Sequence, residues 1–206
     1  MNMIPMDAEN FRAVNTEIET VLLDGLKALR VVKNTKQDRF DEDTYARLPE
    51  FDFHNGTIEA EARSRLLPDA PDFARGFIGL VFRVDGRDAE FESYYVRPTN
   101  GRACADPQRR AHGSQYFSYP GYTFSYFREH AIEGFEAPCD IDLDEWIHLK
   151  AELTDAEGRF YVNDMEHPAL VVPRMKHGPD ARGAVGFYVD TGTEAFFRGL
   201  RVTKTD

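Results

Sequence analysis

The stretch FHNGTIEAEAR (residues 53–63) decides the fold class of this chain. Its Asn-Gly pair at 55–56 signals a tight turn. Beyond that turn, apolar and charged residues alternate with the period of two that characterises a β-strand. The two faces consist of Ile58, Ala60 and Ala62 on one side and of Glu59, Glu61 and Arg63 on the other. The stretch therefore predicts a strand over residues 57–63 with one apolar and one charged face.

Short segments of the same kind recur along the chain, separated by turn signals such as Asp24-Gly25 and Asp85-Gly86. We predict further strands over residues 16–23, 27–33, 76–84, 90–97, 115–118, 122–127, 145–153, 159–162, 169–173, 183–189 and 193–203. Residues 76–84 are apolar on both faces, which indicates a central strand covered on both sides. The charged stretch 36–50 is predicted to be a loop, with one helical turn around residues 43–48. This pattern is typical of an all-β sandwich of two antiparallel sheets.

Length and charge narrow the class of protein further. The 206 residues suit a single domain over residues 1–206, in which residues 1–15 are expected to be an extension that packs on the sandwich. The net charge of −11 argues against a nucleic acid or an anionic membrane as the partner. No apolar run approaches the roughly 20 residues of a transmembrane helix. Residues 1–10 lack the pattern of a signal peptide, so we expect a cytoplasmic protein, or a periplasmic or secreted one if a leader was removed.

The two cysteines, Cys104 and Cys139, lie in segments rich in proline and aspartate. Neither belongs to a CxxC motif or has paired histidines at the spacing of a zinc site. Two free thiols in a reducing cytosol are the expected state, and a disulfide that joins two loops is the alternative.

Several of these segments resemble the strands of concanavalin A-like lectin/glucanase domains. Residues 53–60 (FHNGTIEA) resemble the F-x-(N/D)-G-T-I-E strand of that superfamily, and residues 76–83 and 92–98 resemble its next strand and that strand's partner. The pattern continues through residues 145–146, 161–163, 168–170, 183–186 and 197–202. The resemblance is greatest to bacterial domains of the 3-keto-disaccharide hydrolase type, and laminin-G-like domains are more distant. It implies a jelly-roll fold and a carbohydrate or a sugar-like small molecule as the ligand.

The resemblance to glucanases does not extend to their paired carboxylates. The E-x-D-x-E signature is absent, and Glu59-Ala60-Glu61 is only a partial match. Two positions along a strand separate these carboxylates by roughly 6–7 Å, whereas retaining glycosidases need about 5–5.5 Å. Glu59 is therefore a candidate substrate-binding residue, which Glu92 could join across strands. A salt-bridged surface row beside Arg63 is the alternative.

The loop predicted over residues 99–114 ends in a basic cluster, Arg109-Arg110-Ala111-His112. Long loops inside a compact domain are usually functional or mobile. We predict that Arg110 clamps a carboxylate or polarises a keto oxygen, because guanidinium groups suit that task. His112 is expected to move a proton at a sugar carbon, because a histidine titrates near neutral pH.

Two further residues extend this cluster into the next strand. Tyr116 is the alternative proton carrier, and Gln115 is predicted to bind the substrate together with Arg109. The competing interpretation makes the arginines solvated loop charges and pairs His112 with Asp106.

Seven aromatic rings lie between residues 116 and 127. Tyrosines on an exposed sheet face can stack on sugars and donate hydrogen bonds to them, so Tyr119 and Tyr122 are candidate substrate-binding residues. The alternative is that these rings belong to the core. Tyr95 and Arg97 are predicted to line the same groove if their neighbours point into the core. Arg128 could reach this groove, with a structural ion pair to Glu129 as the alternative.

Asp190 precedes the last strand, in a segment where jelly-roll lectins often hold a structural calcium ion. We therefore expect Asp190 to be a calcium ligand, with a plain turn as the alternative. We expect no other cofactor, because no nucleotide-binding fingerprint occurs.

Three functions compete on these observations. The leading prediction is a carbohydrate-active enzyme of the hydrolase or lyase type that uses acid/base chemistry. The second is a carbohydrate-binding module without turnover, favoured by the missing carboxylate pair. The third is a structural sandwich that forms a homodimer through its aromatic patch.

Overall fold

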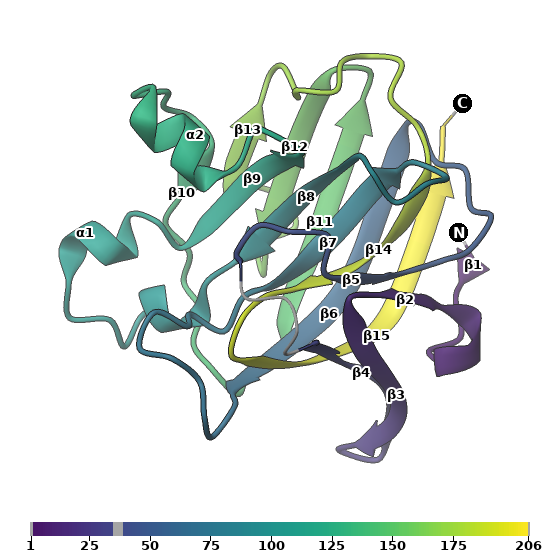
Figure 1. Cartoon of the computed structure of the whole chain (residues 1–206), viewed down its shortest axis with the longest axis horizontal. Coiled ribbons are helices and arrows are strands. Elements are labelled where there is room, and N and C mark those ends of the chain that lie inside the picture. Colours follow the sequence, from purple (N-terminus) through teal and green to yellow (C-terminus); the bar gives the residue numbers. More distant parts are fainter. Residues whose placement is uncertain (1, 35–38, 206) are drawn as a thin grey trace.

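The computed structural model describes residues 2–34 and 39–205, and it shows two antiparallel β-sheets stacked face to face (Figure 1). Sheet A consists of β1 (Asn2–Met3), β3 (Thr16–Leu23), β4 (Leu26–Lys33), β6 (Gly56–Leu66), β11 (Ile147–Thr154), β12 (Glu157–Val162), β13 (Leu170–Val172) and β15 (Thr193–Lys204). Their order is β13-β12-β11-β6-β15-β4-β3, and β1 pairs with β15.

Sheet B consists of β2 (Arg12–Val14), β5 (Tyr45–Arg47), β7 (Ile78–Val84), β8 (Phe91–Val96), β9 (Ser114–Tyr119), β10 (Glu136–Ala137) and β14 (Ala184–Val189). The order is β10-β9-β8-β7-β14-β5-β2. Two short helices, α1 (Pro107–Arg110) and α2 (Phe124–Glu129), lie at one side of this sheet (Figure 1). The all-β jelly-roll sandwich predicted from the alternating pattern is confirmed.

The main core fills the space between the two sheets. In β6 the predicted apolar face is confirmed, because Ile58 and Ala62 are fully buried while Glu59 is partly exposed. Phe160 of β12 stacks on Tyr94 of β8 with ring centroids 4.5 Å apart, so the aromatic rings of the two sheets pack directly on each other. Buried aromatic pairs of this kind add about 0.5–1.5 kcal/mol to the contribution of their buried area.

A second apolar cluster covers the outer face of sheet B. It contains Tyr45, Phe91, Tyr95, Phe117 and Tyr188, all of them almost completely buried. Every residue of β7 is buried, which confirms the prediction of a central strand covered on both sides. Sheet B therefore has two buried faces, whereas the outer face of sheet A is charged.

Two predicted elements are wrong. The helical turn around residues 43–48 is instead β5, a buried strand that pairs with β14 and β2. Its strand conformation comes from these distant neighbours and not from a local pattern. The remainder of the charged stretch 36–50 is described only from residue 39 onward.

The second wrong element is the strand predicted over residues 122–127, which forms helix α2. The first backbone N–H of that helix, at Phe124, donates a 2.9 Å hydrogen bond to the Asp41 carboxylate. A carboxylate at the start of a helix accepts a hydrogen bond from a free N–H group, and its negative charge interacts favourably with the positive end of the helix dipole. This cap lies far away in the sequence, so the local pattern of residues 122–127 did not contain it.

Two smaller expectations concern membranes and thiols. None of the helices in the described ranges is long and apolar enough to cross a bilayer. Cys104 and Cys139 are free, as expected, and are not joined by a disulfide.

Candidate functional site

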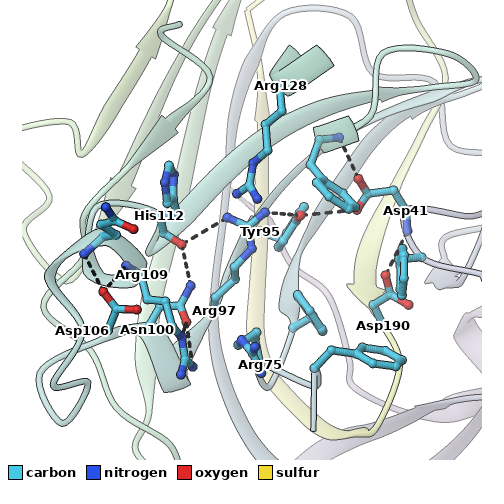
Figure 2. A pocket seen from close by; sticks show the side chains of 15 residues that line it. Asp41, Arg75, Tyr95, Arg97, Asn100, Asp106, Arg109, His112, Arg128 and Asp190 are labelled. Carbon is cyan, nitrogen blue, oxygen red and sulfur yellow. Dashed lines mark hydrogen bonds between the residues drawn. The ribbon is translucent and has the colours of Figure 1, made fainter. Parts of the chain in front are cut away.

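A pocket of about 420 Å³ opens on the outer face of sheet B. Its floor comes from β8, through Tyr95 and the adjoining Arg97. One wall is the loop that carries α1, and another is α2 together with residues 40–41. Figure 2 shows a cluster of arginines around Arg97 and two aspartates, Asp41 and Asp190, on the far side of Tyr95. The pocket thus has an arginine end and an acid end.

Arg97 is the fixed centre of the arginine end. Its guanidinium is buried and donates to the Glu136 carboxylate at 2.7 Å, to the Tyr95 hydroxyl at 2.8 Å and to the Gln115 side-chain oxygen. It also donates to the backbone oxygen of His112 at 3.1 Å. Burial opposes the charge, but Tyr95 and Glu136 hold the pKa of Arg97 above its ordinary value. Arg97 therefore presents a permanent positive charge beneath the pocket.

Glu136 is shared by three basic side chains. Besides Arg97, it accepts a 3.0 Å hydrogen bond from Arg128. The Nδ1 atom of His112 lies 3.0 Å from its other oxygen, at an angle that does not make a hydrogen bond. Burial opposes the carboxylate charge, but Arg97 and Arg128 keep the pKa of Glu136 below its ordinary value. One carboxylate thus offsets two guanidinium groups and lies beside an imidazole ring.

Arg75 and Arg109 complete the arginine end. Arg109 donates through Nε and Nη2 to the side-chain oxygen of buried Asn100, at 3.3 and 3.2 Å. Arg75 donates through Nη1 to the backbone oxygens of Asp72 and Ala74, at 2.7 and 2.8 Å. Burial, followed by the positive charges of Arg109 and Arg97, lowers the pKa of Arg75. Within the described residues, neither Arg75 nor Arg109 forms an ion pair.

The acid end is built on two buried aspartates. Asp190 accepts hydrogen bonds from Lys33 Nζ at 2.6 Å and from the Tyr188 hydroxyl at 2.9 Å. Asp41 accepts from the backbone N–H of Phe124 and, at 3.3 Å, lies in reach of the Tyr95 hydroxyl. Burial and the neighbouring Asp190 charge raise the pKa of Asp41 to about 7. Asp41 can therefore hold or release a proton near neutral pH.

Aromatic side chains form the rim of the pocket. Phe40 and Phe73 pack edge to face with centroids 5.2 Å apart, and 44% of each side chain is exposed. Phe124 of α2 lies 5.9 Å from the Phe40 ring, and Phe77 lies 6.0 Å from the Tyr95 ring. This rim offers apolar ring faces next to the charged interior.

Six of the residues predicted from the sequence line this pocket, namely Tyr95, Arg97, Arg109, His112, Arg128 and Asp190. Arg110 is exposed at the end of α1 and does not line it. Gln115 lies buried beneath Arg97 and fixes its guanidinium. Tyr119 donates to Glu42, Tyr122 packs on Tyr126, and neither residue lines the pocket.

Tyr116 and Glu92 lie on the opposite face of sheet B, inside the main core. The Tyr116 hydroxyl donates to the Glu92 carboxylate at 2.5 Å, and Glu92 pairs with Arg83. Burial, followed by the charge of Glu92, raises the pKa of Tyr116 well above its ordinary value. The structure therefore separates Tyr116 from His112, the other predicted proton carrier, by the thickness of the sheet.

Glu59 lies on the outer face of sheet A, away from the pocket. It pairs with His148 at 2.7 Å, and Glu61 accepts two hydrogen bonds from Arg198. These contacts match the salt-bridged surface row that was the alternative interpretation.

The predicted calcium ligand has a different partner. The Lys33 ammonium group forms an ion pair with one carboxylate oxygen of Asp190, where a calcium ion would have to lie. The backbone N–H of Asp41 donates a hydrogen bond to the other oxygen. No group of three or more metal-ligating side chains occurs in the described part of the chain. The residues around Asp190 therefore do not fit a calcium site.

Sequence reasoning missed Asp41, Arg75 and Asn100, which shape both ends of the pocket. Asp41 and Arg75 lie in loops and Asn100 ends a single turn of 3-10 helix, so no periodic pattern distinguished them from solvated residues. The one available clue was position, because Arg75 directly precedes the central strand region that begins at Gly76.

No protein-family model matches this chain, and no curated protein matches it in sequence. Solved structures do match it in fold. The carbohydrate-binding module CBM66 from Bacillus subtilis aligns with a TM-score of 0.59 and 16% identity, covering 93% of each chain. A Bacillus subtilis protein of unknown function with a galectin-like fold aligns with a TM-score of 0.58 and 13% identity over 99% of this chain and 95% of that one. The cellulose-induced protein Cip1 aligns with a TM-score of 0.52 and 10% identity over 97% and 93% of the two chains. These similarities establish the jelly-roll fold.

Proposed function

We propose that this chain binds a carbohydrate in the pocket on the outer face of sheet B. The observation that carries the proposal is the combination of an aromatic rim with fixed hydrogen-bond donors inside one cavity of about 420 Å³. That volume falls in the range of about 300–1,000 Å³ that is typical of small-molecule sites. Sugars present apolar C–H faces and many hydroxyl groups, and this pocket offers complementary surfaces to both.

The similar solved structures support this ligand class. One of them is named as a carbohydrate-binding module and aligns over 93% of this chain. The sequence resemblance to lectin/glucanase domains points to the same class.

Binding is tested on a glycan array, followed by calorimetry with the sugars that bind. Phe73→Ser removes an exposed ring from the rim and should weaken binding roughly threefold to tenfold, because a stacked ring contributes about 0.5–1.5 kcal/mol. The matched control is Val171→Ser in β13, which changes an apolar side chain of similar exposure on sheet A. Equal affinities for both variants, or no binding to any glycan, would overturn the proposal.

A second candidate function is turnover of the bound sugar by a hydrolase or lyase reaction, of which 3-keto-disaccharide hydrolysis is one form. Two pocket side chains that are able to carry a proton favour it. His112 lies on one wall beside Glu136, and Asp41, whose pKa is about 7, lies at the acid end. The Asp41 carboxyl suits a general acid or base role because its pKa lies close to neutral pH, and histidine is the residue most often used for such proton transfer.

Product analysis after incubation with the bound glycans separates the two candidates. Under the enzyme hypothesis, His112→Ala or Asp41→Asn abolishes cleavage, and His112→Ala leaves the melting temperature nearly unchanged because its side chain is 41% exposed. Tyr116→Phe should retain cleavage, since Tyr116 lies in the core. Binding without any product would leave the carbohydrate-binding function as the whole activity.

A further inference from the structure

We infer that the ligand is an acidic carbohydrate whose anionic group lies between Arg75, Arg97 and Arg109. This inference rests on the proposed function and specifies its substrate class. Carboxylate and sulfate groups share the required chemistry, so a uronate and a sulfated sugar are the two sources to be compared.

Positive charge is concentrated at the arginine end of the pocket. The whole chain carries 36 acidic and 25 basic residues, so its composition does not favour a positively charged site. Yet three guanidinium groups lie close enough that Arg97 and Arg109 lower the pKa of Arg75. Two carboxylates lie at this end. Glu136 already pairs with Arg97 and Arg128, and Asp106 accepts hydrogen bonds from the backbone N–H groups of Gln108 and Arg109. An anion bound here would relieve the repulsion among the arginines.

Several N–H groups of these arginines remain available to a ligand. A guanidinium carries five N–H donors. In Arg109, the Nη1 group has no acceptor among the described residues, because Asn100 and Thr99 take Nε and Nη2. In Arg75, Nε and Nη2 are likewise without an acceptor in the described ranges, since its bonds to Asp72 and Ala74 use Nη1. Both side chains therefore keep donors for a planar or tetrahedral anion.

Arg97 and Arg109 are held in place before any ligand binds. Asn100 is buried and donates to the backbone oxygen of His112 at 3.0 Å, so it is a rigid support for Arg109. Arg97 is fixed by four acceptors. Preorganised donors bind an anion without the entropy cost of ordering long side chains.

The neutral part of the ligand has its own contact surface. The Phe40 and Phe73 rings lie on the rim of the same pocket as the arginines, and Phe77 packs on Tyr95 next to Arg97. A free inorganic anion would leave these rings unused. A sugar ring with an attached carboxylate or sulfate group would use both surfaces.

Calorimetry with four matched oligosaccharides tests the inference. The set consists of a galacturonate trisaccharide, its methyl ester, the neutral galactose trisaccharide and a 6-sulfated galactose trisaccharide. We expect the free uronate or the sulfated sugar to bind at least about tenfold more tightly than the neutral and esterified members, because hydrogen bonds between charged groups are strong. The better of the two identifies the anionic group, and rising salt should weaken its binding selectively.

Variants assign the effect to individual side chains. Arg109→Gln and Arg75→Gln should each reduce affinity for the acidic sugar by about tenfold while changing affinity for the neutral sugar by less than about twofold. The control is Arg87→Gln, an exposed arginine in the turn between β7 and β8 that should leave both affinities unchanged. Circular dichroism verifies that all variants are folded.

The outcomes separate this inference from the proposed function. Equal affinity for the acidic and neutral trisaccharides would overturn the inference and leave carbohydrate binding intact. Tight binding of inorganic sulfate without any sugar binding would overturn both.

Discussion

The outer faces of the two sheets differ in how their charged side chains are paired. On sheet A, acidic and basic side chains alternate across strands and pair locally, as Arg198 does with Glu61 and Arg30 with Glu194. On sheet B, aromatic rings and loops cover the face, and the arginines around Arg97 outnumber the carboxylates beside them. Charge on the outer face of sheet A is thus balanced at close range. A buried place where it is not balanced is a strong candidate for ligand binding.

The largest expected effect comes from the centre of the arginine end. Arg97→Met should lower the free energy of unfolding by about 3–5 kcal/mol, because it leaves half-buried Glu136 and buried Gln115 without a charged donor. Urea denaturation measures this change. A loss below about 1 kcal/mol would mean that the buried cluster is no more stabilising than a surface ion pair, and the contrast between the two faces would fail.

The acid end should make the free energy of unfolding depend on pH. Because the folded pKa of Asp41 is about 7 instead of 3.8, the folded protein keeps a proton that the unfolded chain releases. The Asp41 contribution to stability is therefore present at low pH and is lost as the pH rises through about 7. Between pH 5 and pH 8 this loss amounts to about 3 kcal/mol.

Asp41→Asn removes this titration and isolates it from all other groups. The difference in unfolding free energy between Asp41→Asn and the native protein should grow in favour of the variant by about 3 kcal/mol from pH 5 to pH 8. If the unfolding free energies of the two proteins changed with pH in parallel, Asp41 would have its ordinary pKa in the folded protein.

A smaller effect is expected across the thickness of sheet B. Tyr116→Phe removes the hydroxyl that donates to buried Glu92, which should cost about 1–3 kcal/mol of stability. Ligand affinity should stay the same, because Tyr116 lies in the core and not in the pocket. A selective loss of affinity in a fully folded variant would show that Tyr116 contributes to the site.

The smallest effect is expected on sheet A. Arg30→Met breaks the 2.7 Å contact with Glu194 but should change the free energy of unfolding by at most about 1 kcal/mol, since both groups are partly exposed. Added salt should narrow even this difference. A large loss would show that the charged rows of sheet A are a major source of stability.

Part of the site followed from the sequence. Period-two alternation correctly placed Tyr95 and Arg97 on the face opposite Tyr94, and the basic loop brought Arg109 and His112 to the same pocket. The assignment of Tyr116 to the site did not hold, because its direction depends on its pairing with Tyr94 across the sheet. Strand register of this kind depends on the tertiary structure.

By itself, the sequence determined the class of fold, the faces of the long strands and the presence of a basic, aromatic-rich edge. These properties follow from the residue period and from turn residues, which act over a few positions. Only the tertiary structure decided that Asp41 caps α2, that β5 is a strand, and that Arg75 and Asn100 join the pocket. Each of these depends on contacts between segments far apart in the chain, whose energies no local pattern contains.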